Sequence, residues 1–266
     1  MPTVERNEAE WQEIYDWAEG GEDWSERWGG TEMQWYGAVL PRIHRFVPAR
    51  TILEIAPGFG RWSRFLKELC ERLVLVDLTE RCIEACRRRF AGESHIEYHV
   101  NDGRSLAMVA DGSVDFVFSF DALVHAEEDV LEAYLSELAT KLAPGGTGFL
   151  HHSNLGEYGP PPGRGVPIVG GALRRLGLID GSDHWRAPSM TAAKFRRFAE
   201  AAGLVCLGQE LVNWKSRRLI DCFSVFARRE PGERRETPVV RNPGFMAEAD
   251  RLARLAALYS GLPAHG

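Results

Sequence analysis

The sequence predicts an α/β fold, in which a mostly parallel sheet is covered by helices on both faces. Between residues 51 and 152, apolar runs of strand length alternate with helix-periodic segments. Two further strand-like runs, 204–212 and 219–228, are close enough along the chain to pair as an antiparallel hairpin. A chain of 266 residues, 44% of them hydrophobic, suits one domain with additions.

The alternating region is expected to hold five strands with helices between them. The strands are short runs rich in β-branched and aromatic residues, at 51–56, 73–77, 95–100, 114–120 and 147–152. The helices are expected near 61–71, from Thr79 and Glu80 to about 90, and at 128–142, which Pro144 and Gly145 follow. Thr191 is expected to cap one more helix ahead of the hairpin. This alternation gives a parallel sheet with both faces covered.

Additions are expected before, within and after this sheet. Residues 1–47 are predicted to form a helical N-terminal cap, with helices at 8–18 and 31–46. Residues 48–229 are predicted as the main domain, in which the Gly- and Pro-rich segment 153–190 forms a lid with one short helix. Residues 230–266 are predicted as a polar linker and a helix near 245–259, for packing or for a homodimer contact.

Composition and charge argue against several classes of protein. The five cysteines are an odd number, which does not suit a disulfide framework, and no Cys and His spacing matches a zinc site, so no metal is expected. A net charge of −6 without a long basic block argues against a nucleic-acid partner. No apolar run is long enough to cross a bilayer, and the N-terminus does not resemble a secretion signal. We therefore expect a cytoplasmic protein that does not enter a membrane.

The segment TILEIAPGFGRWS, residues 51–63, predicts a ligand site. A buried strand runs into a bend at Gly58 and Gly60, and the next segment begins a helix whose free amide groups face that bend. Asp77 ends the next strand, where a carboxylate can accept the hydroxyl protons of a ribose. Glycines alone would be weak evidence, but the bend and the strand-end acid together predict a nucleoside site.

Two residues indicate which kind of nucleoside the site would bind. Ser63 stands where a dinucleotide fingerprint has its third glycine or an alanine, which counts against NAD or FAD. Glu54 precedes Gly58 by four residues and places a carboxylate at the mouth of the bend. A carboxylate there would repel a pyrophosphate and complement a ligand with an ammonium or sulfonium charge.

These residues resemble the first motif of class I S-adenosylmethionine-dependent methyltransferases. LEIAPGFG follows that motif, with Ala56 where the family most often has glycine, and Asp77 matches the family's ribose-binding acid. HVNDG matches its adenine-contacting segment, VDFVFSFDALVHAEEDV the end of its fourth strand, and LAPGGTGFL the turn into its fifth. The resemblance covers residues 48–152 in detail. It implies a Rossmann-like sheet of seven strands, mostly parallel with an antiparallel terminal hairpin, and S-adenosyl-L-methionine as cofactor.

The same resemblance implies where the cofactor is held. Glu54, Gly58 and Gly60 would shape the pocket for its methionine part, Asp77 would hold the ribose, and Asp102 the adenine. A tryptophan-rich N-terminal segment is expected to close over the cofactor as a flap, although plain packing of the cap is the alternative. The cofactor-binding residues expected in total are Trp28, Glu54, Ala56, Pro57, Gly58, Gly60, Asp77, Leu78, Asn101, Asp102, Gly103, Phe120 and Asp121.

A looser resemblance concerns the methyl acceptor. WGGTEMQW, SFDALVHAEEDV and HHSN look like the sugar methyltransferases of bacterial polysaccharide and natural-product pathways, which implies a hydroxyl of a small molecule, most often a sugar. The sequence SFDA lacks the loop of enzymes that methylate nucleic-acid bases. Methylation at nitrogen or carbon of a small molecule, an NAD(P)-binding oxidoreductase and a silent cofactor-binding subunit stay open as alternatives.

Three histidines are candidates for the group that takes the hydroxyl proton. Such a group lies beside the reacting methyl, at the carboxyl ends of the fourth and fifth strands. His125 follows Phe120 by five residues, and a structural histidine at a helix start is its alternative. His151 and His152 end the fifth strand on opposite faces, so only one can point at the cleft, and His152 is favoured because it adjoins the lid.

The lid offers candidates for binding the acceptor. His184, Trp185 and Arg186 bring together an imidazole, an aromatic plate and a positive charge, which suit recognition of a polyhydroxylated ring. A turn whose tryptophan docks on the core is the alternative reading of the same residues.

Overall fold

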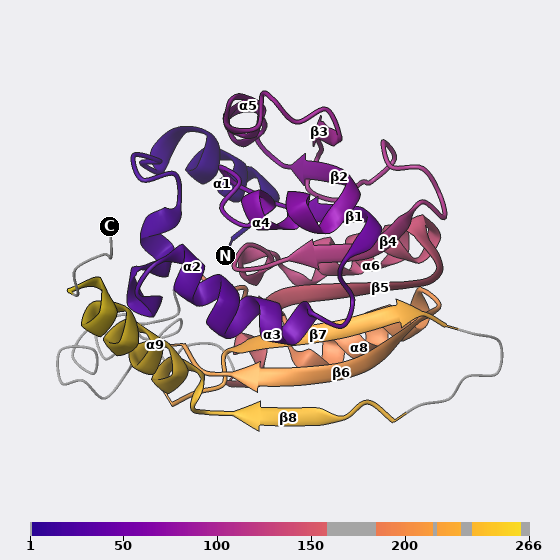
Figure 1. Cartoon of the computed structure of the whole chain (residues 1–266). Helices are drawn as coiled ribbons and strands as arrows, with labels where there is room; N and C mark the ends of the chain where they lie inside the picture. Colours follow the sequence, from indigo (N-terminus) through magenta and orange to yellow (C-terminus); the bar gives the residue numbers. More distant parts are fainter. Residues whose placement is uncertain (1, 159–184, 215–216, 230–235, 262–266) are drawn as a thin grey trace.

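A computed structural model describes residues 2–158, 185–214, 217–229 and 236–261. Figure 1 shows a central sheet with helices on both of its faces. The eight strands, in the order in which they lie side by side, are β3 (Ile96–Val100), β2 (Cys70–Asp77), β1 (Ala49–Ile55), β4 (Val114–Ser119), β5 (Leu142–Ser153), β7 (Asp221–Arg228), β6 (Leu204–Val212) and β8 (Val239–Asn242).

The pairing of the strands confirms a mostly parallel sheet with an antiparallel hairpin. Strand β1 runs parallel to β2 and β4, β2 to β3, and β4 to β5, while β7 lies antiparallel to both β5 and β6. The expected number of seven strands is wrong, because β8 adds an eighth, parallel to β6. This strand has four residues and is largely exposed, so it lacks the apolar pattern by which sequence reveals a strand.

Helices cover both faces of the sheet, as predicted. Helices α6 (Glu128–Lys141) and α8 (Ala192–Ala201) pack on one face, and α5 (Glu80–Arg89) contributes to the core of the other. The caps were predicted correctly, since Thr79 accepts from the amide of Cys82 and Thr191 from that of Lys194. The helix expected near 61–71 is shorter, consisting of α4 (Ser63–Leu66) and the 3-10 turn η4 (Lys67–Leu69), because β2 already begins at residue 70.

The N-terminal cap is a chain of short helical turns. It comprises α1 (Val4–Ala9), η1 (Glu10–Ile14), η2 (Glu22–Trp28), α2 (Thr31–Gln34), η3 (Trp35–Val39) and α3 (Leu40–Ile43). The predicted tail helix is α9 (Phe245–Ser260), which packs against η2 and α2 at the same end of the molecule (Figure 1). Contact is close enough that a Cβ on Gly29, where φ is +85°, would lie 2.7 Å from Cβ of Ala256.

Two short turns complete the described chain, η5 (Leu123–His125) after β4 and η6 (Leu155–Tyr158) after β5. Most of the predicted lid, including its short helix and His184, lies outside the described residues. No helix in the described part of the chain combines the length and the apolar character needed to cross a membrane.

Candidate functional site

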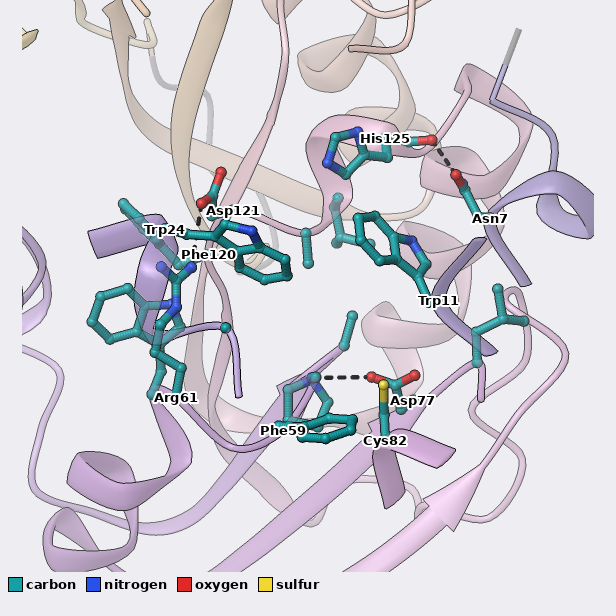
Figure 2. Close-up of a pocket in the computed structure, with 18 of the residues that line it drawn as sticks. Asn7, Trp11, Trp24, Phe59, Arg61, Asp77, Cys82, Phe120, Asp121 and His125 are labelled. Atoms are coloured by element: carbon teal, nitrogen blue, oxygen red, sulfur yellow. Dashed lines mark hydrogen bonds and ion pairs between the residues drawn. The ribbon is translucent and has the colours of Figure 1, made fainter. Parts of the chain in front are cut away.

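A cavity of about 570 Å³ opens at the edge of the sheet where the parallel strands end. It is lined by residues that follow β1, β2 and β4, by the N-terminal turns, and by Trp214 and Met246 from the C-terminal part. Figure 2 shows Trp11, Trp24, Phe59, Asp77 and His125 around it. Carboxyl ends of parallel strands are the usual place for ligands in this type of sheet. A cavity of this size is in the range of small-molecule sites.

The bend after β1 is tied directly to the strand-end acid. Gly58 adopts φ +57° and donates its amide to Oδ2 of Asp77 at 3.1 Å, while Oδ1 of Asp77 accepts from the amide of Thr79 at 2.9 Å. Ala56 also has a positive φ, +58°, which lies in the left-handed region that favours glycine. Burial raises the pKa of Asp77. Because Gly58 is bonded to Asp77, the backbone of the bend and the Asp77 carboxylate lie together at the cavity.

Glu54 does not take part in that surface. Its side chain is buried behind the bend, outside the cavity lining, and accepts from Oγ of Ser63 at 2.5 Å. Burial raises the pKa of Glu54 to about 8, so its carboxyl group is neutral at pH 7. The argument that a Glu54 carboxylate complements a sulfonium charge is therefore wrong for this structure. Gly60 is likewise outside the lining, and its missing Cβ makes room for Phe90.

The N-terminal turns cover the cavity with aromatic side chains. Trp11, Trp17 and Trp24 all line it, and Trp17 stacks on Phe59 of the bend with ring centroids 4.3 Å apart. Trp28 lines it as well and is fully buried. Of these tryptophans, Trp28 was among the cofactor-binding residues predicted from sequence, whereas Trp11 and Trp17 were not. Their number in the first 28 residues was the available signal.

Among the candidate histidines in the described part of the chain, His125 is the one that lines the cavity. Its Nδ1 lies 3.0 Å from the carbonyl oxygen of Trp185. A carbonyl can only accept, so Nδ1 carries the proton of the neutral ring and Nε2 keeps its lone pair. Burial, and then the positive charge of Arg186, lowers the pKa of His125 to about 4. The ring is therefore neutral near pH 7 and able to accept a proton at Nε2.

His151 and His152 lie on opposite faces of the sheet, and neither lines the cavity. His151 accepts the amide of Asp121 at Nδ1, 3.1 Å away, and its Nε2 faces the carboxylate of Asp221. His152, the one favoured from sequence, has both ring nitrogens within hydrogen-bonding distance of Ser153 O and Ser224 Oγ. Burial lowers the pKa of His152 to about 4. Both imidazoles are placed to hold the fold together.

A buried network of four charges lies beside the loop that carries His125. Nη2 of Arg61 is 3.2 Å from Oδ2 of Asp121, and Nη2 of Arg186 is 3.8 Å from its other oxygen. Arg186 also makes two hydrogen bonds to Asp221, at 3.0 and 2.8 Å. Although burial opposes it, the charge of Arg186 holds the pKa of Asp221 below its usual range. Two positive and two negative groups balance one another, which a buried site requires.

This network holds the segment that orients His125. Arg186 follows Trp185, whose carbonyl accepts from His125, and the amide of Ala187 donates to Val124 O at 2.8 Å. The contact between Arg186 and Asp221 therefore fixes the residues on either side of Arg186. These are Trp185, which bonds to His125, and Ala187, which bonds to Val124.

The predicted residues fall into three groups. Those that line the cavity are Trp28, Ala56, Pro57, Gly58, Asp77, Leu78, Gly103, Phe120, Asp121, His125, Trp185 and Arg186. Those outside its lining are Glu54, Gly60, Asn101, Asp102, His151 and His152. His184 lies outside the described residues. Asn101 instead accepts a hydrogen bond from the amide of Gly103 in its own loop. Asp102 accepts from the amides of Arg104 and Ser105 in the same loop.

Residues 52–146 match the family model of a methyltransferase domain. The match contains the bend, the strand-end acid and the His125 turn. It confirms the resemblance to class I methyltransferases in the part of the chain it covers, and it supports an S-adenosylmethionine-dependent enzyme.

Among curated proteins, the chain is similar to nodulation protein S of Bradyrhizobium diazoefficiens, with 32% identity over 120 residues. That alignment covers 42% of this chain and 54% of the relative, so the chain spans about half the length of the curated protein it matches.

Two solved structures show the same fold. The PH0226 protein of Pyrococcus horikoshii aligns with a TM-score of 0.55 and 20% identity, over 83% of this chain and 96% of that one. The DhpI–SAM–HEP complex aligns with a TM-score of 0.53 and 18% identity, over 85% of this chain and 96% of that one. At this identity the likeness concerns the fold, and it confirms the α/β architecture expected from sequence.

Proposed function

We propose that the protein transfers a methyl group from S-adenosylmethionine to a hydroxyl group of a small molecule, and that this acceptor is a sugar or a glycosylated compound. The observation that carries the proposal is the hydrogen bond from Gly58 to Asp77, which joins the glycine bend to the strand-end carboxylate in one cavity. This arrangement suits a nucleoside, because the carboxylate can accept from both ribose hydroxyls while the bend lets a ligand approach the backbone.

The residues of the cavity fit S-adenosylmethionine. Asp77 would hold the ribose, and Leu78 and Gly103 would flank the adenine. All three line the cavity, Leu78 follows Asp77 in the chain, and a Cβ on Gly103 would lie 3.3 Å from Cδ1 of Leu78. The aromatic rings of the N-terminal turns suit a positively charged sulfur, because ring faces attract cations. Because the carboxyl group of Glu54 is neutral and lies outside the cavity lining, the aromatic rings rather than Glu54 would stabilise the positive charge of the sulfur. When bound, the cofactor supplies a methyl group on a cationic sulfur, which makes the methyl group reactive without further activation.

His125 would take the proton of the acceptor hydroxyl at Nε2. With Nδ1 committed to the carbonyl of Trp185, Nε2 is the nitrogen left to accept. Its low pKa makes it a weak base before methyl transfer. A weak base is enough here, because an oxygen that gains a methyl group while keeping its proton becomes far more acidic than imidazolium. The imidazole therefore orients the hydroxyl first and receives the proton as the carbon–oxygen bond forms.

Other residues of the cavity suit a polyhydroxylated acceptor. Trp24, Trp185 and Trp214 line it and offer aromatic plates, and Asp121 and Arg186 offer an acceptor and donors of hydrogen bonds. Stacking combined with a few charged polar groups is the usual recognition of a sugar ring.

Methyl transfer from tritiated S-adenosylmethionine to a panel of neutral, amino and acidic sugars tests the proposal. Labelled sugar is the expected product, and labelling of amino groups alone, or of no sugar, would contradict the acceptor class. His125→Gln should lower the rate about 10²- to 10⁴-fold, the usual range for a lost proton acceptor. The matched variant His152→Gln should keep the rate within a few-fold. Equal rates for the two variants would remove His125 from the role of base.

A further inference from the structure

One side of helix α1 and the turn after it faces the cavity. Val4, Asn7 and Trp11 all line it, at the spacing that places side chains on one side of a helical segment. Asn7 is the polar member of this set, and Figure 2 shows it next to the turn that carries His125.

The orientation of the Asn7 amide is fixed by a single contact. Nδ2 of Asn7 donates to the carbonyl oxygen of His125 at 2.9 Å. Because a carbonyl oxygen only accepts, the amide nitrogen occupies that side and Oδ1 is turned away from it. Oδ1 is buried and has no hydrogen-bond partner among the described residues. A buried acceptor without a donor costs free energy, so a ligand that supplies one is favoured.

Asn7 stands at the adenine end of the cavity. Val4, one helical turn before it, lies over Gly103 and Leu78, since a Cβ on Gly103 would be 3.1 Å from Cγ1 of Val4 and 3.3 Å from Cδ1 of Leu78. Asp102, expected from sequence to bind adenine, is exposed and accepts amides of its own loop. Asp102, which was expected to bind the base, therefore lies outside the cavity lining, whereas Asn7, which carries an acceptor without a partner among the described residues, is one of the lining residues.

We propose that Oδ1 of Asn7 accepts a hydrogen bond from the 6-amino group of adenine. This inference rests on the proposed use of S-adenosylmethionine. The 6-amino group is the hydrogen-bond donor on the edge of an adenine ring, whereas hypoxanthine carries a carbonyl oxygen at that position and would meet Oδ1 with a second acceptor. The same Asn7 side chain would then join base recognition to the His125 turn through Nδ2.

Calorimetric titration with S-adenosylhomocysteine and with S-inosylhomocysteine tests the inference without a methyl acceptor. The two ligands differ at the purine edge, so the ratio of their dissociation constants reports recognition of that edge. Wild type should prefer S-adenosylhomocysteine by about tenfold or more. In Asn7→Leu the preference should fall to near one, mainly because S-adenosylhomocysteine binds more weakly.

Two further variants separate recognition from structural damage. Gln12 belongs to the same N-terminal segment but does not line the cavity, and its Oε1 accepts from the amide of Arg81. Gln12→Leu should weaken both ligands alike and keep the wild-type ratio, and Asp102→Ala should keep it too. The inference is overturned if Asn7→Leu keeps the ratio, if the ratio collapses in Asp102→Ala instead, or if wild type binds both ligands equally. Binding of neither ligand to wild type would instead refute the proposed cofactor.

Discussion

Replacing Glu54 by glutamine should remove a pH dependence of stability that the wild-type protein has. The carboxyl group is buried, and burial raises its pKa from 4.5 to about 8. Between these two values the folded protein holds a proton on Glu54 that the unfolded chain has released. Stability from this group is therefore fully present below pH 4.5 and is lost as the pH rises towards 8.

The size of the effect follows from the shift. One bound proton corresponds to a slope of about 1.4 kcal/mol per pH unit, and the slope falls off near each pKa, so between pH 5 and 8 wild type should lose about 3.5 kcal/mol relative to Glu54→Gln. The assay is urea unfolding of both proteins at several pH values in this range. Taking the difference between the two proteins cancels the other titrating groups.

Glu210→Gln serves as the matched control. Although burial opposes it, the hydrogen bond and charge of Arg42 lower the pKa of Glu210. Stability from Glu210 is therefore present above the unfolded pKa and lost only as the pH falls below it, so the control should run parallel to wild type from pH 5 to 8. If the Glu54→Gln curve also runs parallel to wild type, Glu54 is charged in the folded protein and the reasoning about the bend fails.

Two further predictions concern the cap and the base. Gly29→Ala should lower the free energy of unfolding by about 2 to 3 kcal/mol, because its Cβ would meet Ala256 of α9. Gly203→Ala is the matched control in urea unfolding, because Gly203 has the same φ of +85° but nothing within 4 Å of an added Cβ, so it should cost clearly less. Equal losses would show backbone strain rather than contact. Arg186→Lys keeps the positive charge but cannot make both hydrogen bonds to Asp221, so the segment that carries Trp185 should loosen. Nitrogen-detected NMR should then show His125 as a mixture of tautomers instead of the Nδ1–H form. An unchanged tautomer would contradict the role of Arg186 in orienting His125.

The sequence was sufficient to predict the order of the main strands and helices along the chain, because each shows a clear hydrophobic period. Buried parallel strands read as apolar runs, and Thr79 and Thr191 marked helix starts through a local hydrogen bond. Strand β8 was missed because its stability comes from pairing with β6 rather than from its own apolar pattern. The helix after the bend was overestimated because the boundary with β2 depends on tertiary pairing with β1.

For the site, local patterns were informative and distant contacts were not. Asp77 was found because a strand-end acid after a glycine bend is a short-range signal. Glu54 was misjudged because burial, which decides whether a carboxyl group is charged, is not visible in a sequence. Strand alternation placed His151 and His152 on opposite faces but did not reveal which loops stand over the cavity. Asn7 was missed because its partner, His125, is 118 residues away.

The most direct test of the central claim is a crystal structure of the protein with S-adenosylhomocysteine. The account predicts the nucleoside in the cavity, with both ribose hydroxyls on the carboxylate of Asp77 and the sulfur on the side of His125. A structure in which the ligand lies elsewhere, or in which Asp77 keeps its contacts to Gly58 and Thr79 and makes none to the ribose, would contradict it.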